Sequence, residues 1–332
     1  MSAGVSSASG IGSWPGTDVR EVVRTVRDLL GGEGDVPYLP ETPARGPGAD
    51  LVGRGATRLV ELPVDLQPAG WRMVDRPGRD LARAASFGRQ DLDELAEAYD
   101  GWTGPLKLQV AGPWTLAASV WLPRGDRVLV DEGARRDLAD SLAEGVRQHL
   151  SDVQRLVPGA DLVLQVDEPS LPGVLAGELP SASGYGRLRA VDPADALPVL
   201  TRVLDAAGDR RRVVHCCAPN APLPLLRRAG AELALDAGLL TDRGWEGVAV
   251  ALEEGTPVWL GAVPTAGDLA PSTTLADALE RRWQQLGLDP ALQDRVVLTP
   301  ACGLATLPYG DAVRRQRAAT EVARELTERA SD

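Results

Sequence analysis

The chain has 332 residues, of which 44% are hydrophobic and 25% charged, as is typical of a folded globular protein. The net charge of −12, without a basic stripe, argues against nucleic-acid binding, and no apolar run approaches the roughly 18–20 residues that span a membrane. The three cysteines cannot form a disulfide framework and the start of the chain lacks an export signal, so we expect a cytoplasmic protein without a membrane partner.

Strands and helices alternate along most of the chain. The first part predicts a flexible start (1–8), a short strand (10–13), an amphipathic helix (19–30), an extended segment (36–41), a hairpin-like excursion (58–74) and a short helix (90–99). The rest predicts strands at 106–113, 161–169, 211–219, 231–236, 257–263 and 295–304, with helices at 132–156, 193–207, 245–254, 275–286 and 311–329.

Eight strands separated mostly by helices build a parallel sheet that closes on itself. No linker rich in Pro, Gly or Ser marks a domain boundary, so we expect a single α/β domain over residues 1–332, a (β/α)8 TIM barrel. An open doubly wound sheet is the alternative, but no Gly-x-Gly-x-x-Gly turn follows the first strand.

Soft metal ligands gather at one predicted strand end. Because side chains alternate along a strand, His215 and Cys217 share one face, and we expect Cys216 to lie inert on the other. The eighth strand of a barrel brings Cys302 to the same rim. Three protein ligands with an open position are typical of catalytic zinc, whereas structural zinc is usually closed by four. The alternative for this strand is a buried thiol pair beside a satisfied core histidine. The second histidine, His149, lies among polar residues of a helix and is expected at the surface.

Other polar residues end strands at this rim. Thiolate-rich zinc is suited to binding an incoming thiol and holding it as a thiolate near neutral pH. Glu41 and Asp167 would hold a cationic group of the same substrate, and Ser13 with neighbouring amides would take a carboxylate. An amino-acid thiol has these groups. Asp236 is either a further zinc ligand or a hydrogen-bond anchor.

Five short motifs resemble, in the family's order, those of the catalytic barrel of cobalamin-independent methionine synthase. They are IGSWP (11–15), GPWT (112–115), QVDEP (165–169), HCC (215–217) and TPACGL (299–304). The resemblance implies zinc held by His215, Cys217 and Cys302, with Asp236 where the family has a glutamate as its fourth ligand. It implies homocysteine as the thiol, with Ser13 near its carboxylate and Glu41 and Asp167 at its amino group. Ile11 is expected as a further substrate-binding residue. The expected catalytic residues are therefore His215, Cys217, Cys302 and Asp167.

The chain also departs from the family pattern. The family's histidine on the seventh strand has no match at residues 260–264, and Ala301 replaces an acid. The second barrel of the long family members is missing, so the chain is similar to the short, single-barrel members, some of which take the methyl group from a corrinoid protein.

We therefore expect a zinc-dependent methyltransferase that converts homocysteine to methionine, with a corrinoid or methyltetrahydrofolate as the methyl donor. Three alternatives stay open at this stage. The first is an alkyltransferase acting on a different thiol, and the second is a catalytically degenerate barrel that binds zinc or a thiol. The third, a barrel resembling uroporphyrinogen decarboxylase, needs no metal and leaves the three ligands without a purpose.

Overall fold

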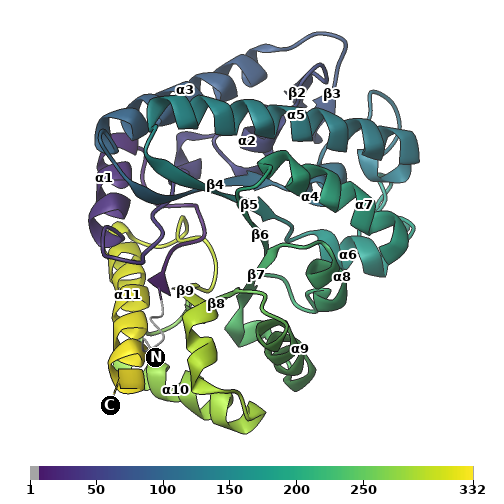
Figure 1. Ribbon diagram of the computed structural model, residues 1–332. Coiled ribbons are helices and arrows are strands. Elements are labelled where there is room, and N and C mark those ends of the chain that lie inside the picture. Colours follow the sequence, from purple (N-terminus) through teal and green to yellow (C-terminus); the bar gives the residue numbers. More distant parts are fainter. Residues whose placement is uncertain (1–6, 332) are drawn as a thin grey trace.

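Seven parallel strands form a curved sheet in the computed structural model, which describes residues 7–331 of the chain (Figure 1). In spatial order the strands are β1 (Ser7–Ala8), β9 (Val296–Pro300), β8 (Val258–Val263), β7 (Glu232–Asp236), β6 (Arg211–Cys216), β5 (Ala160–Asp167) and β4 (Gly104–Ala111). Because all neighbours are parallel, the carboxyl ends of the strands share one rim.

The segment 36–41 lies between the two edge strands and closes the barrel. Parallel bridges join it to the β1 side (Ser9–Val36 and Ser13–Glu41) and to β4 (Tyr38–Lys107). Pro37 and Pro40 have no N–H group to donate, which interrupts the ladder and explains why only isolated bridges form. The predicted eight-stranded TIM barrel is thereby confirmed.

Helices cover the outer face of the sheet (Figure 1). They are α1 (Val19–Leu29), α2 (Leu51–Ala56), α3 (Arg79–Ala98), α4 (Pro113–Ser119), α5 (Glu132–Leu156), α6 (Leu171–Ala176), α7 (Pro193–Leu204), α8 (Leu223–Arg228), α9 (Asp242–Glu253), α10 (Ser272–Leu286) and α11 (Tyr309–Ser331). Alternation along β5 separates two cores, because Leu162 and Leu164 pack in the main core while Val163 joins a small cluster inside the barrel. Of the helices in the described residues, none combines the length and apolar character needed to cross a bilayer.

Helix α5 has the predicted bounds, but it corrects the prediction for His149. Leu142 and Val146 lie on its buried stripe, and Asp131 caps its start by accepting a hydrogen bond from the backbone of Ala134 at 2.8 Å. His149 falls on the same stripe, three residues after Val146, and its side chain is buried rather than solvated. Burial, followed by nearby arginines, lowers the pKa of His149 well below its ordinary value.

Three further predictions concern element boundaries. Ser7 and Ala8 were expected in a flexible start but form β1, while residues 1–6 lie outside the described residues. Helix α3 begins at Arg79 rather than at the predicted residue 90. The sequence did not indicate this start, because the polar first half of the helix carries little helical periodicity. The predicted excursion is confirmed as an antiparallel hairpin of β2 (Val64–Gln67) and β3 (Gly70–Met73).

Candidate functional site

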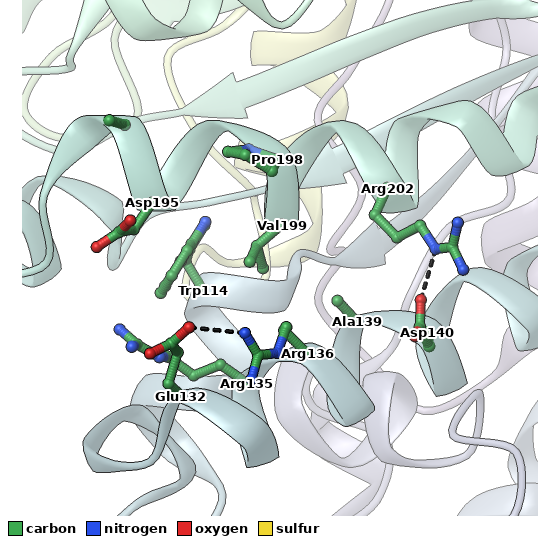
Figure 2. A pocket seen from close by; sticks show the side chains of 11 residues that line it. Trp114, Glu132, Arg135, Arg136, Ala139, Asp140, Asp195, Pro198, Val199 and Arg202 are labelled. Carbon is green, nitrogen blue, oxygen red and sulfur yellow. Dashed lines mark hydrogen bonds and ion pairs between the residues drawn. The ribbon is translucent and has the colours of Figure 1, made fainter.

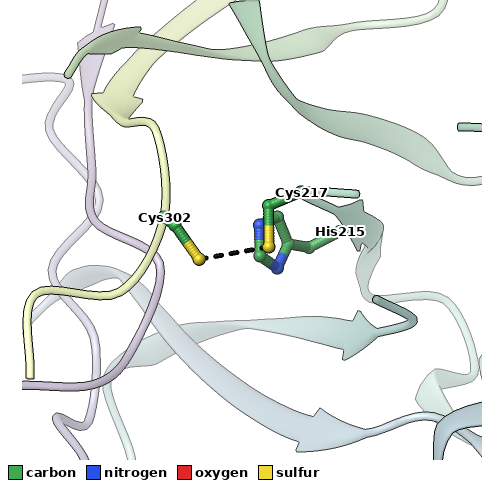
Figure 3. Close-up of side chains that lie close together, drawn as sticks. All are labelled: His215, Cys217 and Cys302. Atoms are coloured by element: carbon green, nitrogen blue, oxygen red, sulfur yellow. Dashed lines mark hydrogen bonds between the residues drawn. The ribbon is translucent and has the colours of Figure 1, made fainter. Parts of the chain in front are cut away.

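Three metal-ligating side chains meet at the carboxyl rim of the barrel. His215 lies near the end of β6, Cys217 directly follows that strand, and Cys302 lies in the turn after β9. Their ligand atoms all lie within 4.8 Å of one another, and the two sulfurs are 3.1 Å apart. Figure 3 shows the three side chains pointing toward one another from two separate chain segments. Within residues 7–331, no other group of three or more His, Cys, Asp or Glu side chains is assembled this tightly.

The chemistry of this His–Cys–Cys cluster fits a metal ion. The Nδ1 atom of His215 is 2.8 Å from Oδ1 of Asp167, whereas its Nε2 atom is buried without a hydrogen-bond partner. Such an atom is costly unless a ligand satisfies it. The hydrogen bond between the sulfurs lowers the pKa of Cys302 and raises that of Cys217. One imidazole nitrogen and two sulfurs form a donor set that zinc prefers.

Two carboxylates lie at the same rim as the cluster, on segments of the barrel that flank β4. Asp167 ends β5, and its Oδ1 atom accepts hydrogen bonds from Gln165 at 2.7 Å and from His215, which leaves Oδ2 without one. Glu41 ends the segment 36–41, and its Oε1 atom is 3.0 Å from Nε of Arg54. Burial raises the pKa of Glu41, Arg54 opposes this, and the charge of Asp167 adds to it. The charges of the two acids therefore influence each other across the rim.

A buried ion chain extends behind Glu41. Arg54 of α2 also pairs with Asp91 of α3, and Asp91 accepts a second bond from Arg45 at 2.6 Å. The Asp91 side chain is fully buried, and those of Arg54 and Arg45 are 12% and 7% exposed. This series of ion pairs was not predicted from the sequence, because the short, glycine-containing helix α2 that carries Arg54 was not predicted.

Ser13 and Ile11 lie beside the cluster on the first wall of the barrel. The backbone oxygen of Ser13 accepts a hydrogen bond from Leu304 at 2.8 Å. A Cβ atom on Gly303 would lie 2.0 Å from Oγ of Ser13, so the Ser13 hydroxyl is packed against the turn that carries Cys302. Ile11 is buried, and its carbonyl oxygen accepts hydrogen bonds inside the barrel, as described below.

Asp236 stands apart from the cluster. Its Oδ1 atom accepts a hydrogen bond from the backbone of Gly238 at 2.8 Å, and it caps the 3-10 turn Ala237–Leu239. Asp236 ends β7 and therefore lies at the same rim. Burial raises the pKa of Asp236, and the charge of His215 opposes this shift. Of the two expected roles, the structure displays that of a hydrogen-bond anchor, and Asp236 is not among the tightly grouped ligands.

The chain's only lysine lies inside the barrel beneath the site. Lys107 is fully buried, and its Nζ atom donates to the carbonyl of Ile11 and to Oε1 of Gln165, both at 2.7 Å. The Lys107 ammonium lies 4.9 Å from the centre of the Tyr38 ring. Burial lowers the pKa of Lys107 to about 7, although Asp167 and Glu41 oppose the shift. A single basic residue in an otherwise apolar strand was the signal in the sequence that could have found it.

Two hollows lie on the helical side of the barrel, away from the cluster. One, of about 370 Å³, lies between α4, α5 and α7, and Figure 2 shows its charged walls. Arg136 pairs there with Glu132, and Arg202 with Asp140, so these charges are largely satisfied. The neighbouring hollow, of about 740 Å³, is lined mainly by residues 188–193, with Leu129, Val130 and Leu175 among the others. Neither includes a residue of the His–Cys–Cys cluster.

Comparison with known proteins identifies a family and solved structures of similar fold. Residues 6–325 match the profile of a family described as cobalamin-independent synthase, catalytic domain. No curated protein matches the sequence. The B12-independent methionine synthase from Shewanella sp. W3-18-1, solved in complex with selenomethionine, superposes with a TM-score of 0.62 at 12% identity, with 98% of each chain covered. At that identity the likeness shows the fold. A structure from Toxoplasma gondii ME49, provisionally assigned as a deoxyribose-phosphate aldolase, reaches a TM-score of only 0.42 at 13% identity, covering 96% of this chain and 92% of the other, and supports no functional argument.

Proposed function

Because the chain belongs to the family of cobalamin-independent synthase catalytic domains, we propose that it is a zinc-dependent methyltransferase that converts homocysteine to methionine. The observation that carries this proposal is the His–Cys–Cys cluster, with its unpartnered Nε2 atom and paired sulfurs. The similar Shewanella methionine synthase was solved with selenomethionine, an analogue of methionine, which is in keeping with a thiol-methylating site.

His215, Cys217 and Cys302 would hold the metal ion. When bound, zinc would keep the substrate thiol as a thiolate near neutral pH, where a free thiol with a pKa of about 8.5 is mostly protonated. Asp167 contributes by accepting the hydrogen bond from Nδ1 of His215, which turns Nε2 toward the two sulfurs. A carboxylate behind a ligating histidine in this way fixes its ring and makes it a better ligand.

Glu41 and Asp167 would bind the amino group of homocysteine. Oδ1 of Asp167 is used by Gln165 and His215, so Oδ2 of Asp167 would accept from the ammonium, while Glu41, which is bonded to Arg54 and Gln109, would face the same group. An ammonium has three donors and can bond both acids at once. Ser13, which pairs with Glu41, would lie toward the substrate carboxylate, and Ile11 would contribute to the same wall of the site.

Methyl transfer then depends on positioning. The substrate sulfur supplies the electron pair of the new S–CH₃ bond, and the bond between the methyl group and its donor breaks with its electron pair left on the donor. The thiol proton is given up to solvent before transfer. Holding the two reactants in line supplies the acceleration without a covalent enzyme intermediate. We propose a methylated corrinoid or methyltetrahydrofolate as the donor.

The amount of zinc in protein purified without chelators tests the proposal. We expect one equivalent in the wild-type protein and a large loss in Cys302→Ser. Cys216→Ser is the matched control, because the Cys216 side chain is buried on the other face of β6 and burial raises its pKa to about 11. Assays with homocysteine and methylcobalamin, methylated corrinoid protein or methyltetrahydrofolate identify the donor. A wild-type protein that holds no zinc, and binds none when zinc is added, would contradict the proposal.

A second candidate is alkylation of a thiol that lacks an amino group. Arg54 already neutralises Glu41, and this observation favours a less cationic substrate. The single variant Glu41→Gln separates the two functions, because it leaves Asp167 in place to orient His215. It should weaken activity with homocysteine, whereas activity with a thiol that has no ammonium should persist.

A further inference from the structure

A chain of hydrogen bonds crosses the barrel interior from the only lysine to the His–Cys–Cys cluster. Lys107 donates to Oε1 of Gln165 at 2.7 Å, and Nε2 of Gln165 donates to Oδ1 of Asp167 at 2.7 Å. The same Oδ1 atom is 2.8 Å from Nδ1 of His215. Nε2 of Gln165 also donates to the carbonyl of Ile11, at 2.9 Å. We call the series Lys107, Gln165, Asp167 and His215 the relay.

The direction of the relay is fixed at its lysine end. A lysine side chain can only donate when charged, so it selects the amide oxygen of Gln165 and turns the amide nitrogen toward Asp167. Rotating the amide by half a turn would place two donors together at Lys107 and two acceptors together at Asp167. Both partners of Lys107 are acceptor oxygens, and a neutral amine still has two hydrogens to donate to them. The order of donors is therefore the same whether or not the amine is charged.

The relay determines which nitrogen of His215 carries the proton. Gln165 holds the carboxylate of Asp167 in place, and that carboxylate accepts from Nδ1 of His215. The proton is thereby kept on Nδ1, and Nε2 keeps its lone pair, facing Cys217 and Cys302 without a partner. We infer that Lys107 is a positioning residue for the metal site, acting through Gln165 and Asp167 to select the ligating tautomer of His215.

The groups around residue 107 explain why a lysine stands there. Apart from the two histidines, every other basic residue of the chain is an arginine. A guanidinium is a broad planar group with five donors, whereas an ammonium is a compact group on a flexible stem. The position offers two acceptor oxygens and the face of the Tyr38 ring, and Lys107 is fully buried between them. These partners match an ammonium and leave the additional donors of a guanidinium unpaired.

The composition of the chain makes the tautomer measurable. It has two histidines, so protein labelled with ¹⁵N-histidine gives only two sets of ring signals, and a His215→Gln variant assigns them. Protonated and unprotonated ring nitrogens resonate far apart. In zinc-free wild-type protein we expect His215 to carry its proton on Nδ1. In Lys107→Met and in Gln165→Leu we expect a mixture of tautomers.

Zinc affinity, measured by competition with a chromogenic chelator, is the second readout, and this part rests on the proposed function. Loss of groups that orient a metal-binding histidine typically weakens metal affinity by about 10- to 100-fold, and we expect this range for both variants. Val163→Ala is the matched control. Val163 pairs with Lys107 across β4 and β5 inside the barrel, so its truncation loosens the same layer without touching the relay.

The outcomes separate the two proposals. Wild-type ring signals and wild-type zinc affinity in both variants would overturn the relay, as would an equal loss of zinc affinity in Val163→Ala. If the wild-type protein binds no zinc, the proposed function fails, and the ring signals of the zinc-free protein still decide whether Lys107 positions His215.

Discussion

Replacing Arg54 by methionine tests the buried ion chain most directly. Methionine keeps much of the apolar stem but removes the guanidinium that pairs with Glu41 and Asp91. Asp91 retains Arg45 as a partner, whereas Glu41 loses its only ion-pair partner among the described residues. The variant therefore leaves one buried carboxylate without an ion-pair partner.

The expected cost follows from the burial of this pair. Removing one member of a buried ion pair costs about 3–5 kcal/mol, because the other charge stays desolvated. Unfolding entropy is about 2.1 cal/mol/K per residue, or about 0.7 kcal/mol/K for 332 residues. The midpoint of thermal unfolding should therefore fall by about 4–7 °C at pH 8.

The loss should also depend on pH. Burial raises the pKa of Glu41 above its ordinary value of 4.5, and Arg54 opposes the shift. Without Arg54 the pKa rises further, so the folded variant binds a proton more tightly than the unfolded chain does. Its stability consequently falls as the pH rises above 4.5, and the difference from the wild type shrinks as the pH is lowered toward 4.5.

Thermal unfolding followed by circular dichroism measures both effects. The double variant Glu41→Gln, Arg54→Met should regain much of the lost stability, because residue 41 then carries no charge. Arg20→Met is the matched control: the Arg20 side chain is 52% exposed, and its ion pairs with Glu94 and Glu97 should contribute little to stability because solvent screens them. Equal midpoints of thermal unfolding for Arg54→Met and the wild type at pH 8 would contradict a stabilising ion pair at Glu41. A double variant no more stable than Arg54→Met would contradict it as well.

Two further predictions concern the barrel wall and its lysine. A Cβ atom on Gly145 of α5 would lie 1.6 Å from the backbone oxygen of Arg58, so Gly145→Ala should cost about 3 kcal/mol or more in thermal unfolding. Gly133→Ala in the same helix meets only the Asp131 side chain at 3.3 Å and should be neutral or stabilising by up to about 1 kcal/mol; equal effects of the two would contradict the packing. Because burial lowers the pKa of Lys107 from 10.5 to about 7, the unfolded chain binds a proton that the folded chain has released between these values. Wild-type stability relative to Lys107→Met should therefore rise from pH 7 to 10.5 in urea unfolding, and a flat difference would show that the amine stays charged in the barrel.

Patterns that repeat along the sequence were sufficient for the barrel and for the ligand cluster. The apolar stripe of α5 gave its bounds, and alternation along β6 placed His215 and Cys217 together, opposite Cys216. Placing Cys302 beside them needed only the rule that strand ends of a parallel barrel share a rim.

The features that were missed depend on tertiary contacts. His149 was expected at the surface from its polar neighbours, yet helical spacing from Val146 turns it inward, so the period outweighed local polarity. Arg54 contacts Glu41 through a short helix whose two glycines hide it from propensity arguments. The role of Lys107 depends on Gln165, which lies 58 residues away along the chain.

The way the barrel closes has a consequence for how the pocket adapts to its substrate. Residues 36–41 are joined to their neighbours by isolated bridges, because the two prolines of this segment lack backbone N–H donors. Strands β4 and β5, in contrast, pair along their whole length. Openings of lowest free energy occur where backbone bonding is sparse, so the amide of Glu41 should exchange its hydrogen with solvent before those of β5 and β6. Of the two acids proposed to bind an ammonium, Glu41 thus lies on the more compliant segment, whereas Asp167 lies on the more rigid β5, next to the strand that carries His215. Such a pocket can adjust to the backbone of an amino acid without disturbing the atoms around its sulfur.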